Sequence, residues 1–239
     1  MRPGLQARAK AGDGELPEGA EKVRAVEAMF DRIAPRYDAL NRIMTLGLDR
    51  GWRRRAVRCL ALPRRASVLD LGCGTGDLCR ELAAAGFAAV GVDRSAGMLA
   101  ARATGVPMLR ADVLELPFPD RSVDGVVSGF VLRNLVSLPG FAAECARVLR
   151  RGGRMVLLEV DAPRGPVLRA GHAVYFGRVV PWVGGLLSDA AAYRYLPRSV
   201  AYLPDEPELL ALLRSVGFPD ATKLSCTGGI AQLLIGTKA

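Results

Sequence analysis

The chain has few of the residues on which metal centres and disulfide frameworks depend. Its 239 residues contain one histidine, His172, and five cysteines that form no Cys-x-x-Cys pair. This composition argues against a zinc site, and we expect no metal. The number of cysteines is odd and their spacing irregular, which indicates reduced thiols that pack as small core residues.

Long apolar runs are also missing. The N-terminus has no apolar stretch of the kind that a secretory signal requires. The best candidate for a spanning helix, residues 173–187, is too short and is interrupted by Arg178 and Pro181. The sequence therefore predicts a cytoplasmic protein.

Charge is plentiful but unevenly placed. The net charge is +9, and residues 1–65 hold 15 Lys/Arg against 8 Asp/Glu, whereas residues 66–162 hold 10 against 11. The basic excess gathers around residues 50–65. Such a patch suits an anionic membrane surface or nucleic acid, and it is equally compatible with a solvated helix face.

The length suits one domain with a short appendage. Residues 1–19 are polar and rich in glycine and proline, which predicts a disordered tail before a domain over 20–239. A helical pattern begins at Lys22 and stops before Pro35, and a second covers 49–60. We expect residues 20–65 to form a helical cap on the domain that follows.

From residue 67 the pattern changes to short apolar strands that alternate with helices. Predicted strands at 67–71, 88–93, 107–110, 123–128 and 154–160 alternate with helices at 77–85, 95–103 and 139–149. Strands that are apolar almost throughout indicate a parallel sheet covered on both faces. The alternation predicts a Rossmann-like, doubly wound α/β domain.

The C-terminal part first departs from this rhythm and then returns to it. Residues 163–200 are apolar and helical in pattern, which predicts a lid insertion. A helix then follows, with Asp205 as its N-cap and Gly217 as its C-cap. Two last strands, at 221–226 and 230–236, form an antiparallel hairpin. The expected sheet is thus seven-stranded and mainly parallel.

The stretch VLDLGCGTGD, residues 68–77, joins the first strand to its helix through Gly72, Gly74 and Gly76. A glycine loop at a helix N-terminus lets a ligand approach the backbone closely. The spacing differs from the Gly-x-Gly-x-x-Gly of dinucleotide sites. Asp77 comes directly after the loop and would repel a pyrophosphate, so we expect a ligand without phosphate.

Acidic residues lie near the ends of three successive strands: Asp70, Asp93 and Asp112. An acid after the second strand accepts hydrogen bonds from ribose hydroxyls. Together with the glycine spacing, this is the pattern of class I S-adenosylmethionine-dependent methyltransferases. The predicted cofactor-binding residues are Asp70, Gly72, Cys73, Gly74, Thr75, Gly76, Asp93, Arg94, Met98, Asp112, Val113 and Gly129.

Over residues 22–238 the chain also resembles the menaquinone/ubiquinone biosynthesis C-methyltransferases. The segment MFDRIAPRYDALNRIMTLGLDRGWRR looks like the family's N-terminal signature, and LPFPDRSVDGVVSGFVLRN looks like its second. VLRRGGRMVLLEV, SDAAAYRYLPRSV and GFPDATKLSCTGGIAQLLIGTK continue the resemblance to the C-terminus. It implies transfer of a methyl group from S-adenosylmethionine to a ring carbon of a polyprenylated quinol.

The resemblance also implies roles for four residues. Arg133 would hold a developing phenolate and Asn134 would fix its orientation. Tyr37 would hydrogen-bond the quinol or close over the cofactor, and Asp77 would hold a water or the methionine amine. Plainer roles stay open: an ion pair at the sheet edge for Arg133, a cap for Asn134, and lid packing for Tyr37.

The implied substrate is demethylmenaquinol, with the benzoquinol counterpart left open, as are the prenyl chain length and the proton acceptor. Residues 167–187 are a candidate channel for the prenyl tail, and the basic N-terminal region is a candidate contact with the inner face of the cell membrane. A homodimer is compatible with the sequence. Family members often have histidine where this chain has Leu203 and Leu234, which leaves a histidine base in doubt here.

Three other functions remain open at this point. The first is a C- or O-methyltransferase of another small phenol, which the two leucines allow. The second is a non-catalytic S-adenosylmethionine-binding protein, against which Arg133 and Asn134 argue. The third is an RNA methyltransferase, but the sequence shows no added RNA-binding module, so we expect no nucleic-acid partner.

Overall fold

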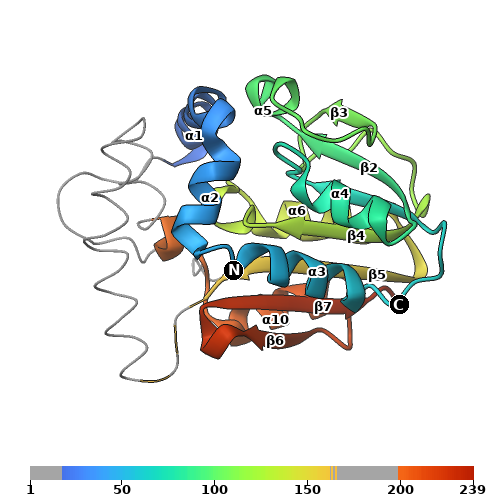
Figure 1. The fold of residues 1–239 in the computed structure, drawn as a ribbon. Helices are drawn as coiled ribbons and strands as arrows, with labels where there is room; N and C mark the ends of the chain where they lie inside the picture. The colour runs from blue at the N-terminus through green and yellow to red at the C-terminus, as the bar shows by residue number, and fades with distance from the viewer. Residues whose placement is uncertain (1–17, 162, 164, 166–198) are drawn as a thin grey trace.

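The computed structural model describes residues 18–161, 163, 165 and 199–239. They form one twisted sheet with helices on both faces (Figure 1). The predicted N-terminal tail falls almost wholly on residues 1–17 and the predicted apolar lid on residues 166–198. Both segments lie outside the described residues, so these two predictions stay predictions.

The sheet has seven strands in the order β3-β2-β1-β4-β5-β7-β6. Their bounds are β1 Ser67–Leu71, β2 Ala88–Asp93, β3 Met108–Arg110, β4 Val123–Gly129, β5 Leu149–Val160, β6 Thr222–Cys226 and β7 Ala231–Thr237. β7 is antiparallel to β5 and β6, and the other pairs are parallel. The predicted sheet is confirmed. Its order reverses between β1 and β4, which is where doubly wound sheets bind ligands.

Apolar strands bury both faces of the sheet. On one face α6 (Leu138–Val148) and α10 (Glu206–Ser215) pack through Phe141 and Leu209. On the other face α3 (Asp49–Cys59) and α4 (Asp77–Ala84) pack through Trp52, Leu78 and Leu82. Leu234 is fully buried in the first core, and Leu203 packs against it. The two leucines therefore occupy core positions and do not line the pocket described below.

The N-terminal cap holds one helix that the sequence pattern did not predict. α1 (Gly19–Ile33) ends where expected, but a 3-10 turn, η1 (Ala34–Arg36), leads directly into α2 (Tyr37–Thr45). Pro35 lies in the first turn of η1, where the backbone N–H groups make no hydrogen bond within the helix, so its missing N–H costs none. The proline therefore redirects the chain without ending the helical region.

Local capping explains several other boundaries. The side chain of Ser95 accepts a hydrogen bond from Met98 N at the start of α5 (Ala96–Ala100), and Asp205 caps α10 through Glu208 N. Gly217 follows α10 at φ +105°, which suits glycine. α5 is shorter than predicted because Ala103 N donates to Thr75 O, 3.1 Å away, and the chain turns toward the glycine loop.

Candidate active site

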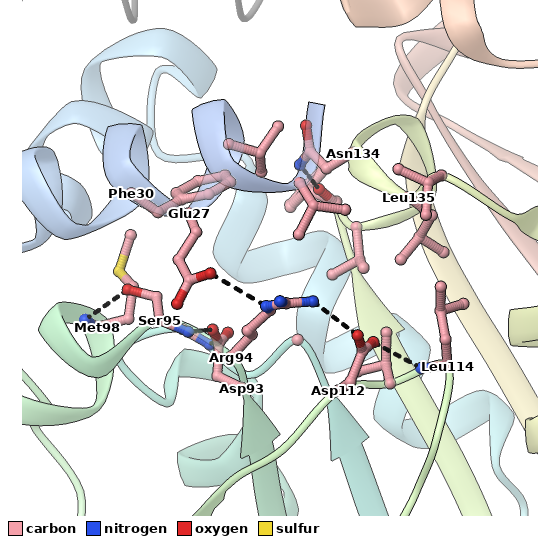
Figure 2. A pocket seen from close by; sticks show the side chains of 18 of the residues that line it. Glu27, Phe30, Asp93, Arg94, Ser95, Met98, Asp112, Leu114, Asn134 and Leu135 are labelled. Carbon is pink, nitrogen blue, oxygen red and sulfur yellow. Dashed lines mark hydrogen bonds and ion pairs between the residues drawn. The ribbon is translucent and has the colours of Figure 1, made fainter. Parts of the chain in front are cut away.

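A pocket lies where the glycine loop and the ends of β2 and β4 face helix α1 (Figure 2). It is mostly apolar, with a few charged groups converging on it, as is typical of small-molecule sites. Its lining residues are Val23, Val26, Glu27, Phe30, Tyr37, Gly72, Gly74, Asp93, Arg94, Ser95, Met98, Asp112, Val113, Leu114, Gly129, Phe130, Val131, Asn134, Leu135 and Val136.

The glycine loop is tied to the end of β2 by backbone hydrogen bonds. Gly72 N and Cys73 N both donate to Val92 O, at 2.8 and 3.0 Å. Gly72 has φ +70°, and a Cβ there would lie 2.3 Å from Cγ2 of Val131. A side chain at this position would push Val131 out of the pocket wall, so the residue must be glycine.

Asp93 fixes both the loop and the turn after β2. Its carboxylate accepts from Gly74 N at 2.8 Å and from Ser95 N at 2.9 Å. Burial raises the pKa of Asp93, and the backbone N–H donors partly oppose this. The side chain is half-buried and lines the pocket, so it presents a carboxylate at the place predicted for a ribose-binding acid.

Arg94 and Asp112 form an ion pair on the rim of the pocket, with Arg94 Nη1 2.7 Å from Asp112 Oδ2. Arg94 Nε also lies 3.1 Å from Oε2 of Glu27 on α1 (Figure 2). Arg110 at the end of β3 pairs with the other Glu27 oxygen, at 3.1 Å. Helix α1 is thus joined across the pocket to the ends of β2 and β3.

Tyr37 opens α2 and contributes an aromatic wall. Its ring packs edge-on against Phe30, with centroids 5.9 Å apart. Burial raises the pKa of Tyr37, and the neighbouring side-chain amide of Asn41 opposes the rise. The neighbouring Asp38 accepts a 2.5 Å hydrogen bond from Thr75 Oγ1, which fastens α2 to the glycine loop.

Arg133 lies in η2 (Leu132–Asn134), just past β4, and is only 9% exposed. It forms a buried ion pair with Glu159 on β5, the acid at the sheet edge. Its guanidinium also stacks 5.7 Å from the centroid of Phe130, a pocket residue. Among the described residues, the buried Nε–H of Arg133 has no hydrogen-bond partner. Asn134 lines the pocket and donates to Phe130 O at 3.3 Å.

Several predicted site residues do not line the pocket: Asp70, Cys73, Thr75, Gly76, Asp77 and Arg133. Asp70 is fully buried and accepts a hydrogen bond from Cys79 Sγ at 3.2 Å. Burial raises its pKa to about 7. Asp77 is ion-paired with Arg80 and with Arg53, whose Nη1 is 3.1 Å from Asp77 Oδ2.

The sequence interpretation missed the contribution of α1. Val23, Val26, Glu27 and Phe30 all line the pocket. Their helical spacing predicted a helix but could not show which face covers a site. Lys22, one residue earlier, is buried; its Nζ donates to Leu135 O at 2.8 Å and lies 3.4 Å from the ring centroid of Tyr202. Burial lowers the pKa of Lys22 to about 8.

These features fit a nucleoside with a cationic, phosphate-free arm. Gly72 and Gly74 present backbone without side chains to the pocket, and Asp93 presents its carboxylate there. Met98, Val113 and Leu114 add apolar surface to the pocket wall. The fold, with its antiparallel β7 and this site at its switch point, is that of class I methyltransferases.

Comparison with known proteins makes the assignment specific. Residues 18–238 match the model of the ubiE/COQ5 methyltransferase family, and the chain belongs to that family. It is 42% identical over 230 residues to the ubiquinone/menaquinone biosynthesis C-methyltransferase UbiE of Geobacter sulfurreducens, covering 91% of this chain and 90% of that one. It is 43% identical over 231 residues to the demethylmenaquinone methyltransferase of Roseiflexus castenholzii, covering 93% and 97%.

Solved structures confirm the fold. A possible histamine N-methyltransferase from Thermotoga maritima superposes with a TM-score of 0.64 at 22% identity, covering 89% of this chain and 99% of that one. The phosphoethanolamine N-methyltransferase 2 of Haemonchus contortus, in complex with S-adenosyl-L-methionine, gives 0.59 at 16% identity, covering 78% and 52%. At these identities the likeness speaks for the fold alone.

Proposed function

We propose that this protein is an S-adenosylmethionine-dependent C-methyltransferase that converts demethylmenaquinol to menaquinol in menaquinone biosynthesis. Family membership and the names of relatives at 42–43% identity support this activity. The observation that carries it in this chain is Arg133, a buried cation beside the pocket with one N–H unpaired among the described residues. A phenolate oxygen is the acceptor that this group lacks.

The residues for the cofactor are those of the sheet edge. Asp93 would hold the ribose hydroxyls, Gly72 and Gly74 would let the methionine arm lie on the loop, and Asp112 with Val113 would flank the adenine. When bound, S-adenosylmethionine supplies an electrophilic methyl group on a sulfonium that leaves as a neutral thioether. Asp77 is ion-paired with Arg53 and Arg80. Its carboxylate would attract the positively charged methionine amine across the loop or through a bridging water.

The remaining residues act on the quinol. A ring carbon next to a hydroxyl becomes strongly nucleophilic when that hydroxyl loses its proton. Arg133 would stabilise the resulting negative charge, since Glu159 orients its guanidinium before substrate arrives. Tyr37 and Asn134 line the pocket beside Arg133 and would position the ring. The proton on the methylated carbon then leaves to solvent or a nearby base.

A polyprenylated substrate also implies contact with a membrane. The described residues include no helix that is long and apolar enough to cross one. We infer a cytoplasmic protein that touches the inner face of the cell membrane transiently, with residues 167–187 guiding the prenyl tail. The excess of basic residues in the first 65 positions supports attraction to anionic lipid. A homodimer is compatible with this arrangement.

The first test is a methyl-transfer assay. Purified protein, S-adenosylmethionine and chemically reduced short-chain demethylmenaquinol are incubated, and the product is read by mass and by the ring position that gains the methyl. We expect one added methyl on ring carbon. The matching benzoquinol, assayed in parallel, decides between the two quinols. Tight cofactor binding without product from either would overturn the proposal and direct the search to other phenols.

A further inference from the structure

The turn that joins α2 to α3, residues 43–48, exposes three apolar side chains. Leu46 is 72% exposed, Leu48 40% and Ile43 37%. Among the described residues only six large hydrophobic side chains are exposed, and three of them lie within these six positions. Scattered exposed leucines need no explanation, but a cluster of this kind marks an interaction site.

The cluster is held in place by the surrounding chain. Gly47 N donates to Arg42 O at 2.8 Å, and Thr45 Oγ1 lies 2.7 Å from Asn41 O and 2.8 Å from Asp49 Oδ1. Leu46 adopts the left-handed conformation, with φ +52°. This conformation is unfavourable for leucine, and glycine or asparagine would suit it better. Neither the backbone conformation nor exposure to water favours a leucine at this position.

The outer face of α2 extends the apolar surface. Ala39 and Ile43 lie four residues apart on one exposed face of α2. Leu46, also exposed, follows at the residue that ends the helix. Leu40 and Asn41 point into the protein. α2 therefore carries an apolar stripe on its solvent side in addition to the side that packs inward.

Positive charge surrounds this stripe. Five exposed arginines lie between residues 36 and 58: Arg36, Arg42, Arg50, Arg54 and Arg58. Over the same range neither carboxylate is exposed. Asp38 is half-buried and accepts from Thr75, and Asp49 is 1% exposed and ion-paired with Arg53. Arg54 is ion-paired with Glu81, 3.3 Å away, so the charge beside the turn comes mainly from Arg42 and Arg50. Apolar side chains flanked by exposed arginines match the interface of an anionic bilayer.

The position relative to the pocket is also suitable. α2 begins with the pocket residue Tyr37 and ends beside Leu46, about 13 Å away at the usual rise of a helix. α1, which covers the pocket, stands next to α2 (Figure 1). A bilayer that receives the turn would therefore lie within reach of the pocket.

We propose that residues 43–48 insert into the interfacial region of an anionic membrane, with Ile43, Leu46 and Leu48 among the lipid chains and the surrounding arginines on the headgroups. The insertion places the pocket over the bilayer, so that a polyprenylated quinol enters without crossing water. This inference rests on the proposed function for its substrate, but the binding surface itself can be tested without the reaction.

The test is flotation of the full chain with vesicles of phosphatidylcholine alone and of phosphatidylcholine with phosphatidylglycerol. The wild type should bind the anionic vesicles at low salt. The triple variant I43S/L46S/L48S should lose about ten-fold or more in binding, and R42Q/R50Q about five-fold for each charge removed. Leu109→Ser and Arg151→Gln, exposed positions of the same kinds elsewhere, are the controls and should bind like the wild type.

Turnover separates this surface from the chemistry. The triple variant should methylate a soluble short-tail quinol at the wild-type rate and a vesicle-embedded long-tail quinol about ten-fold more slowly. Wild-type protein that binds vesicles but methylates neither quinol would overturn the proposed function alone. Unchanged vesicle binding by the triple variant would overturn the membrane surface. The membrane surface would also be overturned if the wild type were a dimer and the same substitutions dissociated it. The turn would then serve self-association.

Discussion

The pocket has two walls that are built in different ways. The sheet wall, formed by the glycine loop and the ends of β1, β2 and β4, is held by backbone hydrogen bonds such as those from Gly72 N and Cys73 N to Val92 O. The cap wall, formed by α1 and α2, is held by side chains, among them Glu27 and Tyr37. The first wall is therefore an extension of the core, whereas the second depends on contacts between side chains.

This difference has energetic consequences. The buried charges behind the sheet wall, Asp70 and the Arg133–Glu159 pair, interact in a medium that water does not screen. The ion pairs of the cap wall involve Arg94 and Arg110, whose side chains are 47% and 61% exposed, so salt weakens them. Substitutions on the sheet wall should have large effects that depend on pH, and those on the cap wall small effects that depend on salt.

The largest effect is expected at Arg133. Arg133→Lys keeps a cation for Glu159 but removes the planar guanidinium, whose Nε–H has no partner among the described residues. We expect kcat to fall about 100- to 1,000-fold, as when a donor to a developing oxyanion is lost. Cofactor affinity, measured by calorimetry, should change little. A variant with normal kcat would reduce Arg133 to a structural ion pair.

A matched double variant separates folding from catalysis. R133M alone leaves Glu159 buried without a partner and should destabilise the protein by about 3–5 kcal/mol. R133M/E159Q removes both charges and should recover most of that stability in urea unfolding, while remaining inactive. Recovered activity in the double variant would show that the arginine serves the fold and not the reaction.

The second prediction concerns Asp70 and stability. Burial raises its pKa to about 7, so the folded protein holds a proton that the unfolded chain releases near pH 4. The folded state binds more protons between these values, and stability is therefore lost as pH rises toward 7. Asp70→Asn removes this loss and should stabilise the protein at pH 8 by about 2–4 kcal/mol.

The check is urea unfolding of both proteins at pH 5 and pH 8. The advantage of Asp70→Asn over the wild type should be largest at pH 8 and less than half as large at pH 5, because the loss begins near pH 4 and is complete near pH 7. Asp124→Asn serves as a control of opposite sign, because hydrogen bonds from Ser67 and Arg150 lower the pKa of Asp124 despite the opposing effect of burial. An equal effect of Asp70→Asn at both pH values would mean that Asp70 is ionised throughout.

The contrast between the sheet wall and the cap wall also explains which features the sequence could predict. The bounds of β1 and β2, the order of elements and the place of Asp93 follow from local patterns, since a parallel strand, its glycine loop and its acid are consecutive in the chain. Glu27 lies 67 residues before its partner Arg94, and no local pattern joins them. α2 was missed because Pro35 was interpreted as the end of the helical region.

The sequence also did not reveal which groups the charged side chains pair with. Arg94, Asp112 and Asp77 were predicted to serve the cofactor or the reaction, and each has an ion-pair partner in the fold. A charged side chain at the right place in a motif is compatible with both roles. Only the geometry shows that Asp93 bonds to the loop backbone and faces the pocket while Asp77 pairs with arginines behind it.

The third prediction tests Asp93 as the cofactor's anchor. Asp93→Asn should weaken S-adenosylmethionine binding about 10- to 100-fold, the loss expected for a charge-assisted hydrogen bond. Because burial raises the pKa of Asp93, wild-type affinity should fall as the pH becomes acidic, whereas the Asn variant should change less. Calorimetry from pH 5 to pH 8 measures both. Asp112 is already paired with Arg94, so Asp112→Asn should weaken cofactor binding less than Asp93→Asn does. A larger loss of affinity in Asp112→Asn would show that Asp112 is the main anchor of the cofactor.

The smallest effect is expected where α1 meets the sheet. Glu27→Gln removes the charge that Arg94 and Arg110 share across the pocket, so bound cofactor should leave about 2- to 5-fold faster in a stopped-flow measurement. Added salt should accelerate release from the wild type toward the variant's rate and leave the variant almost unchanged. Glu21→Gln, on the exposed side of the same helix, is the control. Equal release from Glu27→Gln and the wild type at low salt would show that apolar packing through Phe30 holds α1 down, and the cap wall would then resemble the sheet wall more than its ion pairs suggest.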